Sequence, residues 1–125
     1  MTTPVERMRS LRWGGELLES LQSDTSLPEG FAARAALLAP TFPTPQALAR
    51  LLEADVPRWP PEFGVAIDGA RLLFEEIQFG GHGSRHTRRD VLYTLRHFPL
   101  QRASTWTAAA SVPGGLRNWL APECC

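Results

Sequence analysis

Large apolar residues recur at intervals of three and four over much of the chain, and this spacing predicts helices rather than strands. The clearest run is Phe63, Ile67, Ala70, Phe74 and Ile77, with spacings of 4, 3, 4 and 3. Such a stripe forms one apolar face of an α-helix and packs against a core. No segment shows a convincing alternation of apolar and polar residues, which is the pattern of a half-buried strand. The chain is therefore predicted to be all-α.

Capping residues and prolines divide the chain into about five or six short helices, which suggests a small helical bundle. Val91, Leu92, Leu95 and Phe98 are expected to be the buried residues of the helix that contains them, and His97 is expected to hydrogen-bond the end of that helix. The expected helices run from Thr3 to about Gln22, from a capping box at 26–29 to Pro40, from Thr44 through Leu52, from Glu62 through Ile77, from Ser84 to about Phe98 and, more weakly, from Arg102 to Ala110.

The two halves of the chain align with each other, without a gap, over about forty positions when one is shifted by 56 residues. Identical residues then coincide, for example Glu19 with Glu75, and Phe42-Pro43 with Phe98-Pro99. Matched apolar periodicity in one register indicates a repeated unit. We therefore expect a single domain over 1–125 that contains two tandem helix-hairpin units, an internal pseudo-repeat of 3–56 and 59–112, followed by a tail at 113–125.

The composition is that of a soluble globular protein, with 43% hydrophobic residues and a mean hydropathy of -0.18. Thirteen basic and 13 acidic residues balance, so no net charge attracts nucleic acid or anionic lipid. All basic residues are arginine, which fits codon bias in a GC-rich genome or, alternatively, selection for bidentate contacts. No apolar run is long enough for a membrane span, the N-terminus lacks an apolar leader core, and the adjacent Cys124 and Cys125 are poorly placed for a disulfide. A cytoplasmic location without membrane association is expected.

The first 45 residues resemble a small helical family that occurs in proteobacterial genomes and their mobile elements. The family unit tends to end in an Arg-His-aromatic-Pro signature, which the second half keeps as Arg96-His97-Phe98-Pro99 and the first half replaces with Ala39-Pro40-Thr41-Phe42-Pro43. The resemblance implies a bacterial, helical, cytoplasmic protein, and the family brings no established activity. The residues that carry it are Thr3-Pro4, Glu6-Arg7, Arg9, Leu17-Leu18, Leu21, Asp24, Leu27-Pro28-Glu29, Arg34 and Leu37-Leu38.

The glycine-rich stretch before the fifth expected helix is a candidate anion site, formed by Gly81, Gly83 and Ser84 at a helix N-terminus. A turn relaxed by glycine, with Ser84 as N-cap, explains the same residues and is the favoured interpretation. His82 and His86 have a spacing of four, but no third ligand lies nearby. The sequence therefore predicts no metal site and no cofactor.

No pair or triad of residues has a recognisable catalytic context, so an enzyme is not predicted. We instead expect non-catalytic binding to a macromolecule, most readily as an adaptor, inhibitor or regulator acting on a bacterial protein partner. Exposed tryptophans among Trp13, Trp59, Trp106 and Trp119 would serve as anchors. The alternative is a nucleic-acid-binding regulator that uses the arginine-rich helix at 84–98. Under either hypothesis the candidate surface consists of Arg85, Arg88, Arg89, Tyr93 and Arg96.

Overall fold

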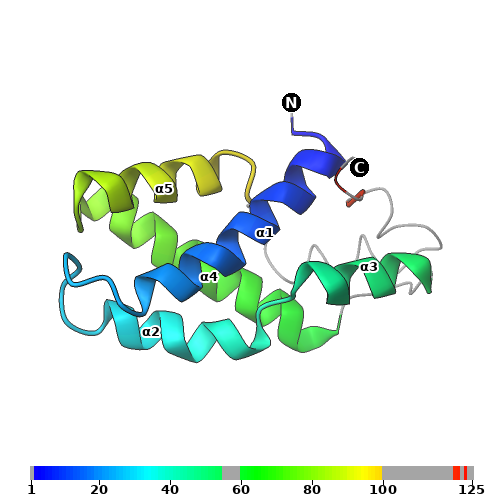
Figure 1. Cartoon of the computed structure of the whole chain (residues 1–125), viewed down its shortest axis with the longest axis horizontal. Helices are drawn as coiled ribbons and strands as arrows, with labels where there is room; N and C mark the ends of the chain where they lie inside the picture. Colours follow the sequence, from blue (N-terminus) through cyan, green and yellow to red (C-terminus); the bar gives the residue numbers. More distant parts are fainter. Residues whose placement is uncertain (1, 55–59, 100–119, 122, 124–125) are drawn as a thin grey trace.

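The computed structural model describes residues 2–54, 60–99, 120, 121 and 123. These residues form helices and connecting turns without a strand, so the prediction of an all-α bundle is confirmed. The elements in chain order are α1 (Pro4–Leu21), α2 (Phe31–Leu38), the short 3-10 helix η1 (Ala39–Thr41), α3 (Pro45–Glu53), α4 (Pro61–Gly80) and α5 (Arg85–Arg96) (Figure 1).

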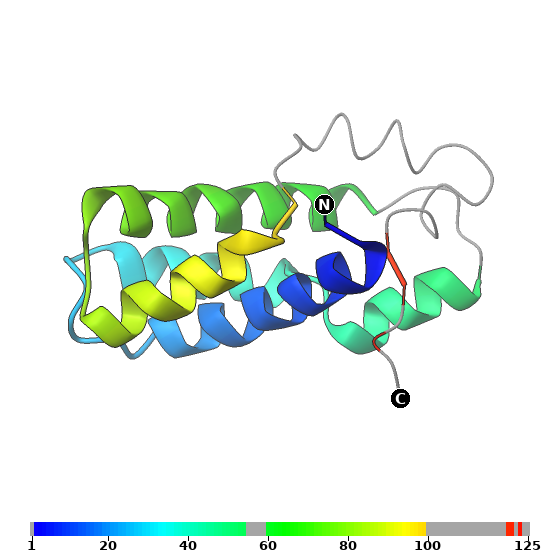
Figure 2. The same cartoon turned by 90° about the horizontal axis from the view of Figure 1, so that it is seen from above.

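Four of the helices form an antiparallel bundle. α1 packs against α2 and α5, and α4 packs against the same two helices, so each helix has two neighbours that run in the opposite direction (Figure 2). The turn between α1 and α2 and the turn between α4 and α5 therefore lie at the same end of the bundle. α3 lies at the other end and packs against α1.

The core lies between these four helices. The predicted stripe of α4 faces it, because Ile67, Ala70, Phe74 and Ile77 are buried, and Phe63 is half-buried against them. Phe42 and Phe98 stack with their ring centroids 6.3 Å apart, and Phe98 also meets Phe74 edge-on. Aliphatic side chains from the other helices complete the core, namely Leu11, Leu18 and Leu21 of α1, Leu48 of α3, and Val91 of α5.

Three predicted helix starts are confirmed by their caps. Thr3 accepts a hydrogen bond from the backbone N–H of Glu6 at 3.2 Å, and Glu6 accepts one from the Thr3 N–H at 2.9 Å, which completes the capping box. Thr44 caps α3 through the N–H of Ala47 at 3.0 Å. Ser84 caps α5 through the N–H of Thr87 at 3.1 Å.

The predicted start of the second helix is wrong. α2 begins at Phe31, and its N-cap is Gly30, whose φ of 96° is in the left-handed region that glycine adopts most easily. Ser26 does not cap a helix. Its Oγ instead donates to Asp24 and accepts the backbone N–H of Ser84, so the serine joins two turns of the bundle.

Two expectations for α5 and the residue that follows it are also corrected. Leu92 is half exposed, because the inward positions of α5 are occupied by Thr87 and Thr94 together with the buried Val91. The backbone N–H of His97 donates to Leu95 O at the end of α5, but its side chain does not bond this helix end. Its Nε2 lies 3.1 Å from a carboxylate oxygen of Glu6, so it connects α5 to the first turn of α1.

The order of elements is the same in the two halves, with a long helix, a shorter helix and then a Phe-Pro pair. α1 and α2 precede Phe42-Pro43, and α4 and α5 precede Phe98-Pro99. The internal duplication itself stays a prediction. The second-half counterpart of α3, the weaker helix expected from Arg102 to Ala110, lies outside the described residues, as do Trp59, Trp106, Trp119 and most of the tail at 113–125.

Candidate functional site

The outward side of α5 carries four exposed arginines. The buried positions Thr87, Val91 and Thr94 fix the rotation of the helix, and residues one turn apart on the opposite side then point to solvent. We call the resulting surface the α5 arginine face, which consists of Arg85, Arg88, Arg89 and Arg96.

These arginines differ from several others in the chain, which are paired with carboxylates. Arg71 contacts Glu75 at 2.9 Å within α4, and Arg34 of α2 pairs with Glu76 of α4. No described carboxylate forms an ion pair with Arg85, Arg88 or Arg96. Arginines that no described carboxylate pairs with can bind an external anionic group without first losing an internal ion pair.

Asp90, the acidic residue of α5, contacts a histidine of the same helix, and that histidine also contacts Arg89. Arg89 Nη2 donates to His86 Nδ1 at 3.1 Å, because a guanidinium has donors only. The other ring nitrogen of His86, Nε2, lies 3.2 Å from Asp90. This chain of contacts orients Arg89 and holds the carboxylate of Asp90 on the side of α5 that faces α1.

Apolar side chains border the α5 arginine face. Phe79, near the end of α4, is 82% exposed, and Leu92 and Tyr93 are 50% and 52% exposed. Together with Gln78, Leu95 and Arg96 they line a depression of about 510 Å³, which we call the α4–α5 depression. Exposed apolar residues beside unpaired cations are typical of an interaction surface rather than of a purely solvated helix.

Sequence reasoning missed Phe79 and the exposure of Leu92. A signal for Phe79 was present, because Val65, Leu72 and Phe79 are seven residues apart and lie off the buried stripe of α4. All three are exposed. Large apolar residues at heptad spacing on the side of a helix away from its core stripe could therefore have indicated a second apolar face.

The N-terminus of α5, where the sequence offered a candidate anion site, is bonded within the chain. The N–H of Ser84 donates to Ser26 Oγ at 2.9 Å, and Thr87 Oγ1 donates to Asp24 Oδ2 at 2.5 Å. We call Asp24, Ser26, Ser84 and Thr87 the turn clasp. The Asp24 carboxylate already supplies negative charge beside this helix end, and these contacts give no support to an additional anion.

The hydrogen bonds of the turn clasp also lower the pKa of the Asp24 carboxyl group. Burial acts to raise the pKa of Asp24, but hydrogen bonds from Ser26 and Thr87 outweigh it and hold the pKa below its usual value.

Gly81 and Gly83 both have positive φ, of 65° and 84°, and make the sharp turn that brings Ser84 to the clasp. Anion binding at Gly81, Gly83 and Ser84 stays a prediction.

The two histidines spaced four apart have separate environments. His82 lies edge-on to the ring of Phe31, with centroids 5.1 Å apart, whereas His86 contacts Arg89 and Asp90. Within 2–54, 60–99, 120, 121 and 123, no group of three or more histidine, cysteine, aspartate or glutamate residues is placed to hold a metal ion. No helix in the same ranges has the length and apolar character required to cross a membrane.

Comparison of the chain with models of protein families, with curated proteins and with solved structures finds no match. The resemblance of its first 45 residues to a proteobacterial helical family therefore stays a prediction.

Proposed function

We propose that the protein is a non-catalytic binding protein that docks an acidic, amphipathic segment of a partner protein on α5. The proposal is supported by arginines that no described carboxylate pairs with and that lie beside exposed apolar residues on one surface. The acidic side chains of the partner would contact the α5 arginine face, and its apolar side chains would fill the α4–α5 depression. A cytoplasmic adaptor, inhibitor or regulator of a bacterial protein is the role that fits such docking.

The chemistry of arginine supports a carboxylate-bearing partner. A guanidinium pairs with a carboxylate through two parallel hydrogen bonds, which gives both direction and energy. Arg88 and Arg89 are adjacent to the exposed Leu92 at one-turn spacing, so one partner helix could reach both kinds of contact. Aromatic residues and arginine dominate the energetics of protein interfaces, and Phe79 and Tyr93 supply the aromatic part here.

Nucleic acid is the alternative partner for the same arginines. Phosphates would contact the α5 arginine face, but they would gain nothing from the exposed Phe79 and Leu92. The net charge of zero also provides no general attraction to a polyanion. These points favour the protein partner, and the two partners differ in a way that an experiment can separate.

The test uses fluorescence anisotropy with three labelled probes. The first is an amphipathic helical peptide of glutamate and leucine, the second has its leucines replaced by serine, and the third is a short DNA duplex. We expect the glutamate–leucine peptide to bind most tightly, about tenfold or more over the glutamate–serine peptide. Tighter binding of the duplex, with a steep loss in salt, would overturn the proposal in favour of the nucleic-acid alternative.

Variants locate the binding surface. Arg88→Ala combined with Arg89→Ala should remove peptide binding, and Leu92→Ser should weaken it. Arg50→Ala is the matched control, because Arg50 of α3 is exposed and no described carboxylate pairs with it. An equal loss in the Arg50→Ala variant, or no binding of any probe, would contradict the proposed surface.

A further inference from the structure

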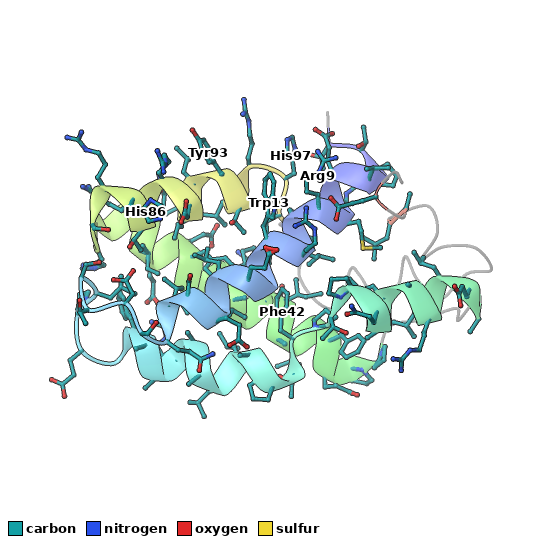
Figure 3. All side chains as sticks on the ribbon, viewed as in Figure 1. Arg9, Trp13, Phe42, His86, Tyr93 and His97 are labelled. Atoms are coloured by element: carbon teal, nitrogen blue, oxygen red, sulfur yellow. The ribbon has the colours of Figure 1, made fainter. Side chains whose placement is uncertain are left out.

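A different surface lies between α1 and α5, where two adjoining depressions share the side chains of Trp13 and Tyr93. One has a volume of about 250 Å³ and the other about 150 Å³. Figure 3 shows Trp13 on α1 and Tyr93 on α5 along this side of the molecule. We call the two depressions together the α1–α5 groove.

The two ends of the groove differ in their charged groups. The larger depression is lined by the carboxylates of Glu16 and Asp90. The smaller one is lined by the guanidinium groups of Arg9 and Arg96 together with the carboxylate of Glu6, which His97 Nε2 contacts at 3.1 Å. Glu16 and Asp90 line one depression and Arg9 and Arg96 line the other, which agrees with the antiparallel course of α1 and α5.

The aromatic pair lies midway between the two charged ends. Trp13 is between Arg9 and Glu16 along α1, and Tyr93 is halfway from Asp90 to Arg96 along α5. Six or seven residues separate the charged groups on each helix, so the ends are about 10 Å apart at the helical rise of 1.5 Å per residue. The arrangement is the same on both helices although their sequences run in opposite directions.

The charged groups of the groove keep free bonding capacity. Glu16 uses Oε1 to contact Arg12 at 3.1 Å, and Asp90 uses Oδ2 to contact His86 at 3.2 Å, which orients both carboxylates. The second oxygen of each carboxylate has no hydrogen bond to the described part of the chain. At the other end, Arg9 uses Nε to contact Glu123 at 3.1 Å, and Arg96 has no ion pair with any described carboxylate.

We propose that the α1–α5 groove binds a small linear zwitterion. Its ammonium or guanidinium group would lie between Glu16 and Asp90, and its carboxylate would contact Arg9 and Arg96. The aliphatic chain between them would pack against the rings of Trp13 and Tyr93, whose faces also attract the cation. Long-chain ω-amino acids have this chemistry. The groove shares Tyr93 and Arg96 with the α4–α5 depression, whereas Arg88 and Arg89 lie outside the groove and distinguish the two sites.

The test is a titration of the folded chain, followed by proton–nitrogen correlation NMR, with a series of linear probes. ω-Aminooctanoate carries both charges at a separation close to that of the groove, ω-aminobutanoate is too short, and octanoate and octylamine carry one charge each. We expect ω-aminooctanoate to shift the indole signal of Trp13 and the amide of Tyr93. It should bind about tenfold or more tightly than each of the other probes.

Variants test which residues of the groove bind the ammonium group and which bind the carboxylate of the probe. Glu16→Gln with Asp90→Asn should remove the preference for ω-aminooctanoate over octanoate, and Arg96→Ala should remove the preference over octylamine. Glu19→Gln on α1 and Arg50→Ala on α3 are matched controls outside the groove. Circular dichroism checks that each variant folds.

Several outcomes would overturn the zwitterion site. They are equal binding of the singly charged probes, equal binding of ω-aminobutanoate, and the absence of any shift at Trp13 in the wild-type chain. Arg88→Ala with Arg89→Ala should leave ω-aminooctanoate binding unchanged, whereas it should remove binding of the glutamate–leucine peptide. The two proposals can therefore fail independently of each other.

Discussion

Thr87 of α5 donates a hydrogen bond of 2.5 Å to Asp24, which precedes it by 63 residues and lies in the turn after α1. This bond joins α5 to the turn between α1 and α2, at the end of the bundle where the turn between α4 and α5 also lies. Ser26 strengthens the connection, because its Oγ contacts Asp24 at 2.5 Å and accepts the N–H of Ser84 at 2.9 Å. The turn clasp thus attaches the N-terminal end of α5, where Arg85, Arg88 and Arg89 lie, to the turn after α1.

Removal of the Thr87 hydroxyl should destabilise the fold. Thr87→Val keeps the shape of the buried side chain and leaves Asp24 Oδ2 without its donor, so we expect a loss of about 1–3 kcal/mol in the free energy of unfolding. Urea denaturation followed by circular dichroism measures it. Thr25→Val in the same turn is the control, since Thr25 is exposed and should change stability little. Equal losses in the two variants would show that the clasp contributes nothing.

The turn clasp should also weaken in acid. The pKa of Asp24 is lower in the folded chain than its usual value of 3.8, despite the opposing effect of burial, so the unfolded chain takes up the proton more readily. The stability from Asp24 is therefore complete above its unfolded pKa and is lost as pH falls through the folded pKa. Measurements of unfolding free energy below about pH 5 should show a shallower decline for Asp24→Asn than for the wild type. Identical slopes would contradict the role of Asp24.

Two adjacent glycines of α1 should respond oppositely to alanine. A Cβ on Gly14 would lie 2.7 Å from Cε1 of Phe98 and 3.1 Å from Cζ of Phe42, and both rings are buried. Gly14→Ala should therefore cost about 1–3 kcal/mol through overpacking.

Gly15→Ala provides the matched comparison for Gly14→Ala. A Cβ on Gly15 meets nothing closer than 3.5 Å, so alanine should be neutral or add up to about 1 kcal/mol of stability through helix propensity. Thermal unfolding of the two variants compares them directly. If Gly14→Ala were as stable as Gly15→Ala, the stacked rings of Phe42 and Phe98 would not be as tightly packed against α1 as their distances indicate.

Much of the fold could be predicted from the sequence because its signals are local. Thr3, Thr44 and Ser84 cap helices through residues three positions later, and the apolar stripe of α4 repeats over one continuous helix. The start of α2 could not be predicted in the same way. Ser26 has the sequence of a capping residue, but a partner 58 positions away engages its hydroxyl.

The candidate site could be predicted only where its signal is local in the sequence. The periodicity around Val91 indicated which arginines of α5 point outward. It also assigned Leu92 to the core, because hydrophobicity alone ranks leucine above threonine, whereas Thr87 is buried through its bond to Asp24. The α1–α5 groove could not be predicted, since it exists only because α1 and α5 are neighbours in the bundle.

Arg12 of α1 forms ion pairs with two carboxylates, those of Glu123 and Glu16. Arg12 contacts Glu123 through Nε at 2.6 Å and through Nη2 at 3.0 Å, and Glu16 through Nη1 at 3.1 Å. The hydrogen bonds from Arg12 outweigh burial and, with those from Arg9, lower the pKa of Glu123. Glu123→Gln should thus reduce the unfolding free energy by up to about 1 kcal/mol, and the exposed helical pair lost in Glu16→Gln by about 0.3–0.5 kcal/mol.

Salt distinguishes an electrostatic contribution of Glu123 from a packing contribution. Screening shortens the range of exposed charges to about 3 Å in 1 M salt, so the difference between Glu123→Gln and the wild type should shrink when urea denaturation is repeated there. A difference that stays constant in high salt would mean that the segment around Glu123 is attached through its apolar contacts instead. The buried Leu120, three residues earlier, would then be the principal attachment.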